Sequence, residues 1–412
     1  MKLFVTILEE RCDAAIDAIR ALRLEHDGIE VRAERFPSID LHAIRAATDK
    51  PIVLTYRSSS EFLGVPRSSP DDAMRAGIDF VDVEWNAGVQ IDVPERTVLS
   101  HHDYEGIDDA DLIFEKMLRR NCAHTKLAAT PRNFEENERL LALLNSSEEL
   151  RGTRGTPRNS TVIGMGERGL YSRILAPFKG SALTFVAANT IAAPGQLTIE
   201  RALEIYGRGD LRADYVFAVV GNPAGHSLSP SIHNRLFREK RVPAAYTIAS
   251  VERFGEVADA FLRGEPCGLS VTAPFKDDAY AFARARNADI GENAQRALAV
   301  NTLVNLDGRI VADNTDVDGF AALLPHDAQR AAIVGAGGTA RAARVACENA
   351  GIAATIFNRT ASKGDAPLEA LSGFDGDLVI NTLPAGVEVE IPSCRTYVEA
   401  AYGGGARDVD AK

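Results

Sequence analysis

Eight short runs of mostly apolar and β-branched residues, most followed by an amphipathic stretch, organise the first half of this 412-residue chain. Between the runs, apolar residues recur at three- and four-residue intervals, as in residues 11–24, 108–120 and 135–144, which is the periodicity of an α-helix. Alternating strands and helices predict an α/β fold, a (β/α)8 barrel, although strand counting leaves an open doubly wound sheet as the alternative. The predicted strands span Lys2–Leu8, Ile29–Phe36, Pro51–Arg57, Phe80–Trp85, Thr97–Tyr104, His124–Thr130, Thr161–Met165 and Ala182–Ala188.

Charged side chains and a histidine lie in or just after several of these predicted strands. In a barrel, the carboxyl ends of the strands meet at one mouth, where the catalytic groups of such enzymes are found. We therefore expect one mouth of the barrel to hold Glu30, Arg32, Arg57, Glu84, His102 and Lys126.

The strand–helix pattern breaks at residues 207–213, a polar segment with glycines, and restarts with a predicted strand at Tyr215–Gly221. A smaller α/β unit follows, and a connector at Pro325–Arg330 separates it from a strand–turn–helix that begins with Ala331–Gly338. These breaks predict three domains, at residues 1–208, 214–324 and 330–412.

Composition restricts the possible partners and compartments. The chain carries 46 Lys and Arg against 58 Asp and Glu, a net charge of −12, which argues against a nucleic-acid partner because such binding needs many cationic contacts. Its five cysteines never form a Cys-x-x-Cys pair, so neither a disulfide framework nor a metal site is predicted. The first residues lack the order of a signal peptide and no run of 18 apolar residues occurs, so we expect a cytoplasmic protein without membrane contact. The oligomeric state stays open.

Lys126 lies inside a predicted strand, in the segment Ala-His-Thr-Lys-Leu-Ala-Ala-Thr-Pro. A lysine enclosed by a barrel loses hydration, which indicates an amine of lowered pKa that forms an imine with a ketone. The alternative is a lysine that reaches from the strand end to solvent. His102 also ends a strand, as either a proton shuttle or an ordinary histidine at the rim. Arg57, Arg173 and Gln196 add hydrogen-bond donors suited to a carboxylate and to hydroxyls.

Six short motifs occur in order along residues 1–208: Ile-Glu-Val-Arg-Ala-Glu, Leu-Thr-Tyr-Arg-Ser, Ser-His-His-Asp-Tyr, Thr-Lys-Leu-Ala, Leu-Tyr-Ser-Arg-Ile and Ala-Pro-Gly-Gln. In this order they resemble type I 3-dehydroquinate dehydratases. The resemblance implies that Lys126 condenses with the C3 ketone of 3-dehydroquinate, that His102 removes the adjacent proton and helps the C1 hydroxyl leave, and that Glu61 orients the histidine. It also implies that Arg173 binds the substrate carboxylate, and that the hydroxyls and the ring are held by Glu30, Arg32, Arg57 and Gln196.

A second group of motifs follows the break, beginning with Gly-Asn-Pro-Ala-Gly-His-Ser-Leu-Ser-Pro-Ser-Ile-His-Asn at residues 221–234. The two serines at positions 227 and 229 can direct two hydroxyls at one anion, and the second, before a proline, also suits a helix N-cap. With Ser-Val-Thr-Ala-Pro-Phe-Lys, Ala-Val-Asn-Thr and Asn-Thr-Asp further along, the order resembles shikimate dehydrogenases.

The second resemblance implies a role for each matching residue. Ser227 and Ser229 bind the substrate carboxylate, while Lys276 and Asp316 move the hydroxyl proton during reduction. Substrate hydroxyls are bound by Thr272, Asn301 and Asp316. The alternative for the lysine and the aspartate is a surface ion pair, worth about 0–1 kcal/mol.

The segment Ile-Val-Gly-Ala-Gly-Gly-Thr-Ala-Arg-Ala, at residues 333–342, is a strand that turns through glycines into a helix. Such a turn lets the backbone approach a pyrophosphate at the helix N-terminus. A second predicted strand, Ala354–Phe357, leads to Arg359 at the place where an acidic residue would bind the ribose of NAD. An arginine there suits the 2′-phosphate of NADP, which is the predicted cofactor. The residues expected to contact it are Gly335, Gly337, Gly338, Asn358, Arg359 and Thr360.

The two resemblances are to families that catalyse consecutive steps of the shikimate pathway. They predict a type I 3-dehydroquinate dehydratase barrel, followed by a two-lobed shikimate dehydrogenase-like unit with a Rossmann-type NADP-binding lobe. Because nothing before Lys412 matches the family's glutamine-bearing helix, this lobe is expected to be incomplete at its C-terminal end. One alternative is an active dehydratase whose dehydrogenase half is inactive and serves ligand binding or assembly. Another is a non-catalytic sensor of quinate-like acids.

Overall fold

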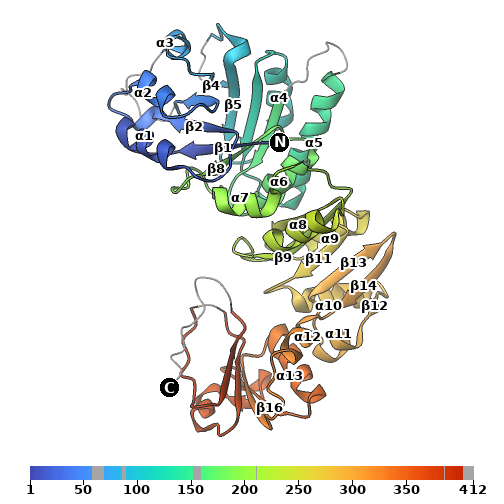
Figure 1. Ribbon diagram of the computed structural model, residues 1–412. Helices are drawn as coiled ribbons and strands as arrows, with labels where there is room; N and C mark the ends of the chain where they lie inside the picture. Colours follow the sequence, from blue (N-terminus) through green and yellow to red (C-terminus); the bar gives the residue numbers. More distant parts are fainter. Residues whose placement is uncertain (58–68, 86–89, 152–158, 210, 385, 402–412) are drawn as a thin grey trace. The chain divides into compact units, whose positions relative to one another are not determined.

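The computed structural model describes residues 1–57, 69–85, 90–151, 159–209, 211–384 and 386–401 (Figure 1). Contacts divide the chain into two compact units. The first comprises Met1–Val219 and Pro223–Glu252, and the second comprises Val220–Asn222 and Arg253–Lys412. Over the described ranges, every helix is too short or too polar to cross the apolar core of a bilayer.

The first unit contains an eight-stranded sheet of parallel neighbours, in the order β7-β6-β5-β4-β3-β2-β1-β8. The N–H of Ala182 donates to the carbonyl of Ser160 at 2.8 Å, which joins the two outer strands. The hydroxyl of Thr161 continues this contact, because it donates to the carbonyl of Leu183 and accepts from its N–H. The predicted (β/α)8 barrel is therefore confirmed. Its strands are β1 (Lys2–Ile7), β2 (Gly28–Arg32), β3 (Ile52–Thr55), β4 (Phe80–Glu84), β5 (Thr97–Asp103), β6 (His124–Ala129), β7 (Asn159–Gly164) and β8 (Leu183–Ala187).

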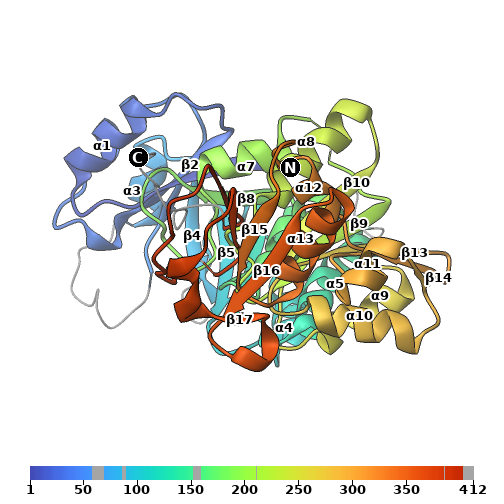
Figure 2. The same cartoon turned by 90° about the horizontal axis from the view of Figure 1, so that it is seen from below.

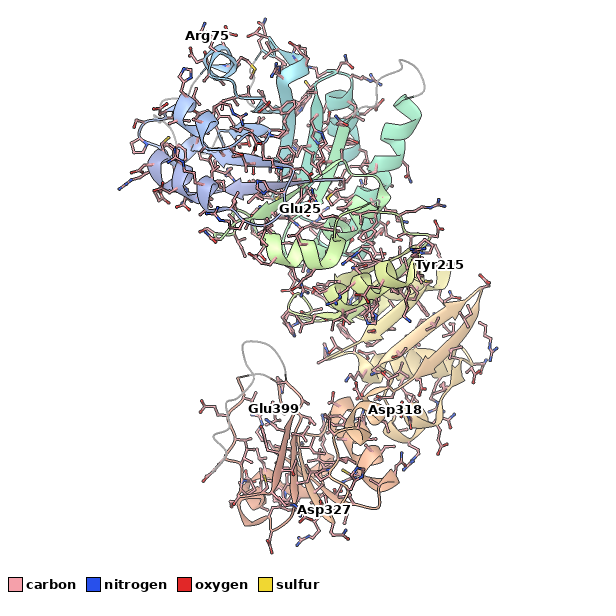
Figure 3. All side chains as sticks on the ribbon, viewed as in Figure 1. Glu25, Arg75, Tyr215, Asp318, Asp327 and Glu399 are labelled. Atoms are coloured by element: carbon pink, nitrogen blue, oxygen red, sulfur yellow. The ribbon has the colours of Figure 1, made fainter. Side chains whose placement is uncertain are left out.

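Helices lie outside the barrel strands (Figure 1). They are α1 (Cys12–Ala21), α2 (Leu41–Ala46), α3 (Pro70–Arg75), α4 (Ala110–Leu118), α5 (Phe134–Arg151), α6 (Leu170–Leu175) and α7 (Ile199–Tyr206), with the 3-10 turns η1 (Ala33–Arg35), η4 (Pro94–Arg96) and η5 (Ala176–Lys179). Asp40, Ser69 and Thr198 precede α2, α3 and α7, and each side chain accepts a backbone N–H of the first turn, which stabilises the helix start. Charged side chains such as Glu25 and Arg75 remain exposed on the surface (Figure 3).

The prediction of a strand over Ile29–Phe36 is wrong at its end. Strand β2 stops at Arg32, and the chain turns into η1, where Ala33 and Glu34 are both buried. A continued strand would send these neighbours to opposite faces of the sheet, whereas the turn buries both. The turn also lets Glu34 accept from Nε of Arg32 at 2.7 Å.

The rest of the first unit consists of β9 (Tyr215–Gly221), α8 (Ser229–Lys240) and β10 (Ala244–Ser250), although Val220 and Gly221 at the end of β9 belong to the second unit. Asn234 ties α8 to β10, because its amide nitrogen donates to the carbonyl of Tyr246 and its amide oxygen accepts from the N–H of the same residue, both at 2.8 Å. Helix α8 begins at Ser229, so Leu228 occupies the N-cap position that the sequence suggests for Ser229.

The second unit begins with a mixed α/β segment whose strands follow the order β11-β13-β14-β12. Its elements are α9 (Gly255–Arg263), β11 (Gly268–Val271), α10 (Lys276–Ala285), β12 (Asp289–Ile290), α11 (Glu292–Ala297), β13 (Thr302–Leu306), β14 (Arg309–Asp313) and α12 (Asp316–Ala321). Strands β13 and β14 form an antiparallel pair, and β14 is parallel to β12.

A parallel five-stranded sheet ends the second unit, in the order β17-β16-β15-β18-β19. The order reverses between β15 and β18, as in a doubly wound dinucleotide-binding sheet, so the predicted Rossmann-type lobe is confirmed as a fold. Helix α13 lies against β15 and β16 (Figure 2). The elements are β15 (Arg330–Val334), α13 (Gly338–Asn349), β16 (Ala353–Asn358), η6 (Ala361–Lys363), β17 (Ala366–Pro367), η7 (Leu368–Gly373), β18 (Leu378–Asn381) and β19 (Thr396–Glu399).

Candidate active sites

One pocket of the barrel brings together seven of the eight residues that the sequence predicts for the first site. They are Glu30, Arg32, Arg57, His102, Lys126, Arg173 and Gln196. Arg32, Arg57 and His102 sit at or just beyond the carboxyl ends of β2, β3 and β5, so the pocket reaches the end where a barrel places its catalytic groups. The eighth residue, Glu61, lies outside the described residues.

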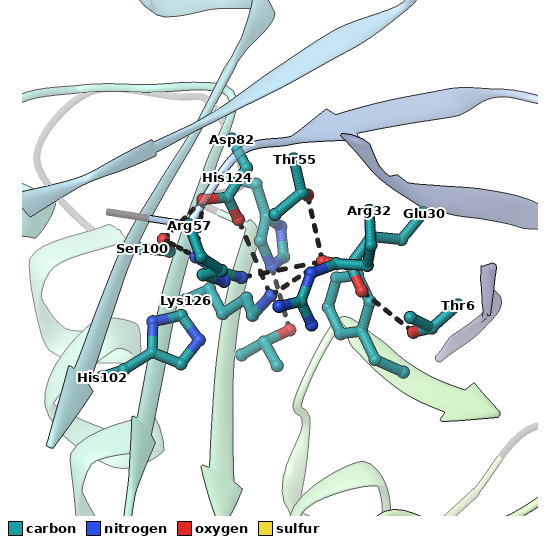
Figure 4. A network of polar contacts seen from close by, with 12 residues as sticks. Thr6, Glu30, Arg32, Thr55, Arg57, Asp82, Ser100, His102, His124 and Lys126 are labelled. Carbon is teal, nitrogen blue, oxygen red and sulfur yellow. Dashed lines mark hydrogen bonds and ion pairs between the residues drawn. The ribbon is translucent and has the colours of Figure 1, made fainter. Parts of the chain in front are cut away.

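The amine of Lys126 is enclosed at the centre of this pocket, and the residue is 4% exposed (Figure 4). Its Nζ lies 3.3 Å from Oε1 of Glu30, 3.6 Å from Oδ2 of Asp82 and 4.1 Å from the ring centroid of Phe185. Burial lowers the pKa of Lys126, and the charge of Glu30 offsets only part of this effect. Of the two interpretations of the sequence, the structure supports the buried amine and excludes a lysine that reaches solvent.

Glu30 remains an anion although it is buried. The hydroxyls of Thr6 and Thr55 donate to its two oxygens at 2.9 and 3.1 Å. Burial by itself would raise the pKa of Glu30, but the charges of Lys126 and two neighbouring arginines outweigh it and lower that pKa to about 2. A fixed anion therefore faces the amine throughout the physiological pH range.

Arg57 contacts Glu84, which the sequence places at the mouth of the barrel, and two residues that the sequence did not identify, Asp82 and Ser100. Its Nη1 donates to Oδ1 of Asp82 at 3.0 Å, to Oε1 of Glu84 at 3.3 Å and to Oγ of Ser100 at 3.1 Å. Asp82 and Glu84 occupy alternate positions of β4 and so point to the same side of the sheet. This alternation of acidic residues within an otherwise apolar strand is the sequence signal that could have identified Asp82 as a site residue.

His102 is held as a neutral imidazole. Its side chain is 11% exposed, and its Nδ1 lies 3.6 Å from Oε1 of Glu84, without a hydrogen-bond partner among the described residues. Burial lowers the pKa of His102 well below its usual value, and the charges of Arg57 and Lys126 lower it further. The ring lies beside the Lys126 side chain (Figure 4), so a base able to accept a proton is placed next to the amine.

Arg173 is a buried cation without a carboxylate partner in the described part of the chain. The residue is 6% exposed, and its Nε donates to the carbonyl of Gly164 at 2.8 Å. Burial lowers the pKa of Arg173 to about 10, so it stays charged at neutral pH. A buried charge that no protein anion neutralises is costly, which favours an anionic ligand at this position.

Gln196 connects the loop before α7 to β1 and β8. Its Nε2 donates to Oγ1 of Thr6 at 3.1 Å and to the carbonyl of Phe185 at 3.4 Å, while its Oε1 accepts from the N–H of Ala192 at 2.8 Å. Through Thr6 the amide is linked to Glu30, so the loop and the anion beside Lys126 belong to one hydrogen-bond network.

A second histidine, His124, lies two residues before Lys126 on the same strand and is 4% exposed. Its Nε2 lies 2.9 Å from Oγ1 of Thr161. Burial and the charge of Lys126 lower the pKa of His124 to about 3. The ring is therefore neutral in the folded barrel down to strongly acidic pH.

His124 is expected to weaken the barrel in acid. The usual pKa of a histidine is about 6.5, so below that pH His124 is protonated in the unfolded chain. In the folded chain it is protonated only below about pH 3. This difference costs about 2 kcal/mol of unfolding free energy between pH 7.5 and pH 5. His124→Gln keeps a donor for Thr161 but does not titrate, so it should lose about 2 kcal/mol less over that range. Urea unfolding followed by the fluorescence of Trp85, the one tryptophan of the chain, measures this. Equal losses in both proteins would contradict it.

Ser227 and Ser229 lie in the first unit, at the turn into α8. Ser227 is 2% exposed and its Oγ lies 3.2 Å from Oγ of Ser229. The Oγ of Ser227 also accepts from the N–H of Ser229 at 3.3 Å, so the two hydroxyls adjoin the N-terminus of a twelve-residue helix. Such an arrangement suits an anion.

The other predicted residues of the second site lie in the second unit. Nζ of Lys276 donates to Oδ2 of Asp316 at 2.5 Å and to Oγ1 of Thr339 at 2.8 Å. Nδ2 of Asn301 donates to Oδ1 of Asp316 at 2.8 Å. The side chains of Lys276 and Asp316 are 12% and 26% exposed, so they do not form the surface pair of the alternative interpretation. Thr272 directly follows β11, and its N–H donates to the carbonyl of Val220 at 2.9 Å.

The three glycines of the turn after β15 occupy their positions for different structural reasons. Gly335 has a φ of +106°, a conformation that residues with a side chain rarely adopt. A Cβ at Gly338 would lie 3.0 Å from the Cβ atoms of Lys276 and Ala299, so this glycine permits close packing against α10. A Cβ at Gly337 would meet nothing within 4 Å, and Gly337 lines a pocket.

That pocket lies at the carboxyl ends of β15 and β16, where a doubly wound sheet binds dinucleotides. Among its lining residues are the predicted Gly337, Asn358, Arg359 and Thr360, together with three cations that the sequence did not single out, Arg341, Arg344 and Lys363. Arg344 pairs with Asp365, whereas Arg359 is exposed and has no carboxylate partner in the described part of the chain. The pocket therefore offers a free guanidinium to an anionic group.

Comparisons with known proteins cover both halves. Residues 3–209 match the family model for type I 3-dehydroquinase, and residues 219–303 match the model for the shikimate dehydrogenase substrate binding domain. The chain is 29% identical to the shikimate biosynthesis protein AroDE of Chlamydia pneumoniae, over 92% of this chain and 83% of that one. It is 26% identical to the bifunctional 3-dehydroquinate dehydratase/shikimate dehydrogenase, chloroplastic, of Arabidopsis thaliana, over 87% of this chain and 64% of that one. It therefore spans less than two thirds of the plant protein.

A solved structure, the dehydroquinate dehydratase and shikimate dehydrogenase from S. pombe AroM, aligns with 94% of this chain and 84% of its own, with 24% identity and a TM-score of 0.40. The type I 3-dehydroquinase model alone covers half of this chain, over the residues that build the barrel and its pocket. The two resemblances seen in the motifs are thus confirmed, and the chain belongs to the type I 3-dehydroquinase family, with a shikimate dehydrogenase substrate binding domain in its second half.

Proposed function

We propose that this chain is a bifunctional enzyme of the shikimate pathway. Its barrel dehydrates 3-dehydroquinate to 3-dehydroshikimate, and its second half reduces that product to shikimate with NADPH. The observation that carries the proposal is the buried amine of Lys126 beside the neutral imidazole of His102. The plant relative is named for both activities, which supports an active second half over an inactive one. The five cysteines are all free, which favours a reducing compartment such as the cytoplasm.

In the barrel, the neutral amine of Lys126 attacks the C3 ketone of 3-dehydroquinate, and water leaves as the imine forms. The iminium withdraws electrons from the adjacent carbon, so His102 can remove a proton there. The C1 hydroxyl then leaves as water with a proton returned by His102, and hydrolysis of the imine frees Lys126 and 3-dehydroshikimate. The charge of Arg173 holds the substrate carboxylate, and Glu30 holds a hydroxyl.

In the second half, Lys276 and Asp316 move the proton of the hydroxyl that forms on reduction. When bound, NADPH supplies the hydride. Lys276 can donate a proton to the developing alkoxide because Asp316 and Thr339 hold its Nζ in one direction. Asn301 fixes the other oxygen of Asp316 and, with Thr272, offers polar groups to the substrate hydroxyls.

The proposal is tested by incubating the chain with 3-dehydroquinate, with and without NADPH, and following 3-dehydroshikimate and shikimate separately. We expect 3-dehydroshikimate without NADPH, and shikimate with NADPH oxidation when NADPH is present. A control reaction supplies 3-dehydroshikimate directly. Accumulation of 3-dehydroshikimate without NADPH oxidation in both reactions would contradict the second activity, and no product in any reaction would favour a non-catalytic sensor.

Arg359 is expected to determine the choice of NADPH over NADH. Its guanidinium follows β16, where it can pair with a 2′-phosphate that NADH lacks. Arg359→Ala should therefore raise the KM for NADPH about tenfold or more and leave the KM for NADH within about twofold, since a charged hydrogen bond is worth about 1.5–3 kcal/mol. Arg286→Ala, at an exposed arginine after α10, is the control. Equal increases for both cofactors would contradict 2′-phosphate recognition.

A further inference from the structure

The turn that carries Ser227 and Ser229 is held at both ends by side chains of the barrel. Oε1 of Glu167, in the loop between β7 and α6, accepts from the N–H groups of Ala224 and Gly225 at 2.9 and 3.0 Å. The same oxygen accepts from Oγ of Ser250, at the end of β10, at 2.8 Å. All these residues belong to the first unit.

Arg201 holds the other end of the turn. It lies in the first turn of α7, and its Nη2 donates to the carbonyl of Ser227. Between the two barrel contacts, the N–H of Ser227 donates to the carbonyl of Ala224 at 3.0 Å and closes the turn. A backbone held by charged groups at both ends has few alternative conformations, so the direction of the Ser227 hydroxyl is set from the barrel.

The electrostatics of Glu167 agree with this role. Burial by itself would raise the pKa of Glu167, but the hydrogen bonds from Gly225, Ser250 and Ala224 outweigh it and lower that pKa. The carboxylate is therefore charged at neutral pH, and one of its oxygens is fully used by three donors. Hydrogen bonds to a charged acceptor are stronger than those between neutral groups, which favours a rigid turn.

We propose that Glu167 and Arg201 are positioning residues for the dehydrogenase half: the dehydratase barrel shapes the serine turn that receives the carboxylate of 3-dehydroshikimate. This inference rests on the proposed function of Ser227 and Ser229. It follows that the two halves are not independent modules, because the substrate affinity of the second depends on side chains of the first.

The test measures KM and kcat for the reductase reaction with 3-dehydroshikimate as substrate, and the dehydratase activity of the same chain reports a folded barrel. Glu167→Ala and Arg201→Ala should each raise the KM for this substrate about three- to tenfold, change the reductase kcat less than twofold, and leave dehydratase turnover unchanged. Glu167→Gln keeps the accepting oxygen and should restore the KM to within about twofold of the unaltered protein.

Arg168→Ala is the matched control. Arg168 neighbours Glu167 in the same loop, but its guanidinium donates to the carbonyl of Arg132 and pairs with Glu252, so this variant should keep the KM of the unaltered protein. A rise equal to that of Glu167→Ala, a parallel loss of dehydratase turnover, or no rescue by Glu167→Gln would overturn the positioning role. Ser227→Ala separates the two hypotheses. If Ser227→Ala leaves the KM for 3-dehydroshikimate unchanged, the serine does not bind the carboxylate. If Ser227→Ala raises this KM but Glu167→Ala and Arg201→Ala do not, the serine binds the carboxylate and only the positioning role of the two barrel residues is refuted.

Discussion

Lys126→Ala is expected to reduce dehydratase turnover by at least about 10⁴-fold, because it removes the nucleophile of a covalent mechanism. Lys126 is the one lysine among the described residues that line the pocket, so no second amine is at hand, and its Nζ pairs with the carboxylates of Glu30 and Asp82. Turnover of 3-dehydroquinate followed by absorbance measures the loss. Reduction with borohydride in the presence of substrate should trap one ligand on the unaltered chain and none on the variant, as read by mass spectrometry.

Two further variants separate the imine from a general loss of the barrel. Lys116→Ala removes an exposed lysine of α4 and should leave both turnover and trapping intact. His102→Ala should lower turnover by about 10²–10⁴-fold, since a general base contributes that much, yet still allow trapping because the amine remains. Substantial turnover by Lys126→Ala, or labelling of another residue after borohydride treatment, would contradict the imine mechanism.

Lys276→Met is expected to lower the kcat of the reductase reaction by about 10²–10⁴-fold, because it removes the proton donor. The methionine keeps an unbranched side chain, one atom shorter than lysine, but has no proton to donate, and Asp316 loses a partner at 2.5 Å. Dehydratase turnover of the same variant should not change, because Lys276 belongs to the second unit and the barrel lies in the first. Stopped-flow measurement of NADPH oxidation records the chemical step directly.

The matched control is Lys240→Met, at the exposed end of α8, which should reduce 3-dehydroshikimate at the normal rate. Asp316→Asn provides a complementary result, since it keeps a hydrogen-bond acceptor for Lys276 but removes the charge. It should lower the reductase kcat less than Lys276→Met does. A reductase rate for Lys276→Met within tenfold of the unaltered chain would exclude this lysine as the proton donor.

Sequence periodicity was sufficient to find the barrel strands, because each is short, apolar and bounded by turns. All eight observed strands overlap the predicted ones, and the largest disagreement is at β2, where η1 follows Arg32. The disagreement arises because burial of Ala33 and Glu34 depends on the surrounding barrel, which a single strand does not reveal. His102 was found from its position at a strand end and Lys126 as a lysine inside a strand, whereas Asp82 and Ser100 were not found, because short polar residues inside a strand are common.

What the sequence determined by itself was the set of reacting groups: an amine in a strand, a histidine at a strand end, a serine turn and a glycine turn, each in a motif specific enough to suggest its chemistry. The tertiary structure alone decided the surroundings of these groups. The amine of Lys126 is enclosed by Glu30, Asp82 and Phe185, which come from three other strands, and this burial lowers its pKa. Desolvation and charge pairing act through space, so no local stretch of residues contains them.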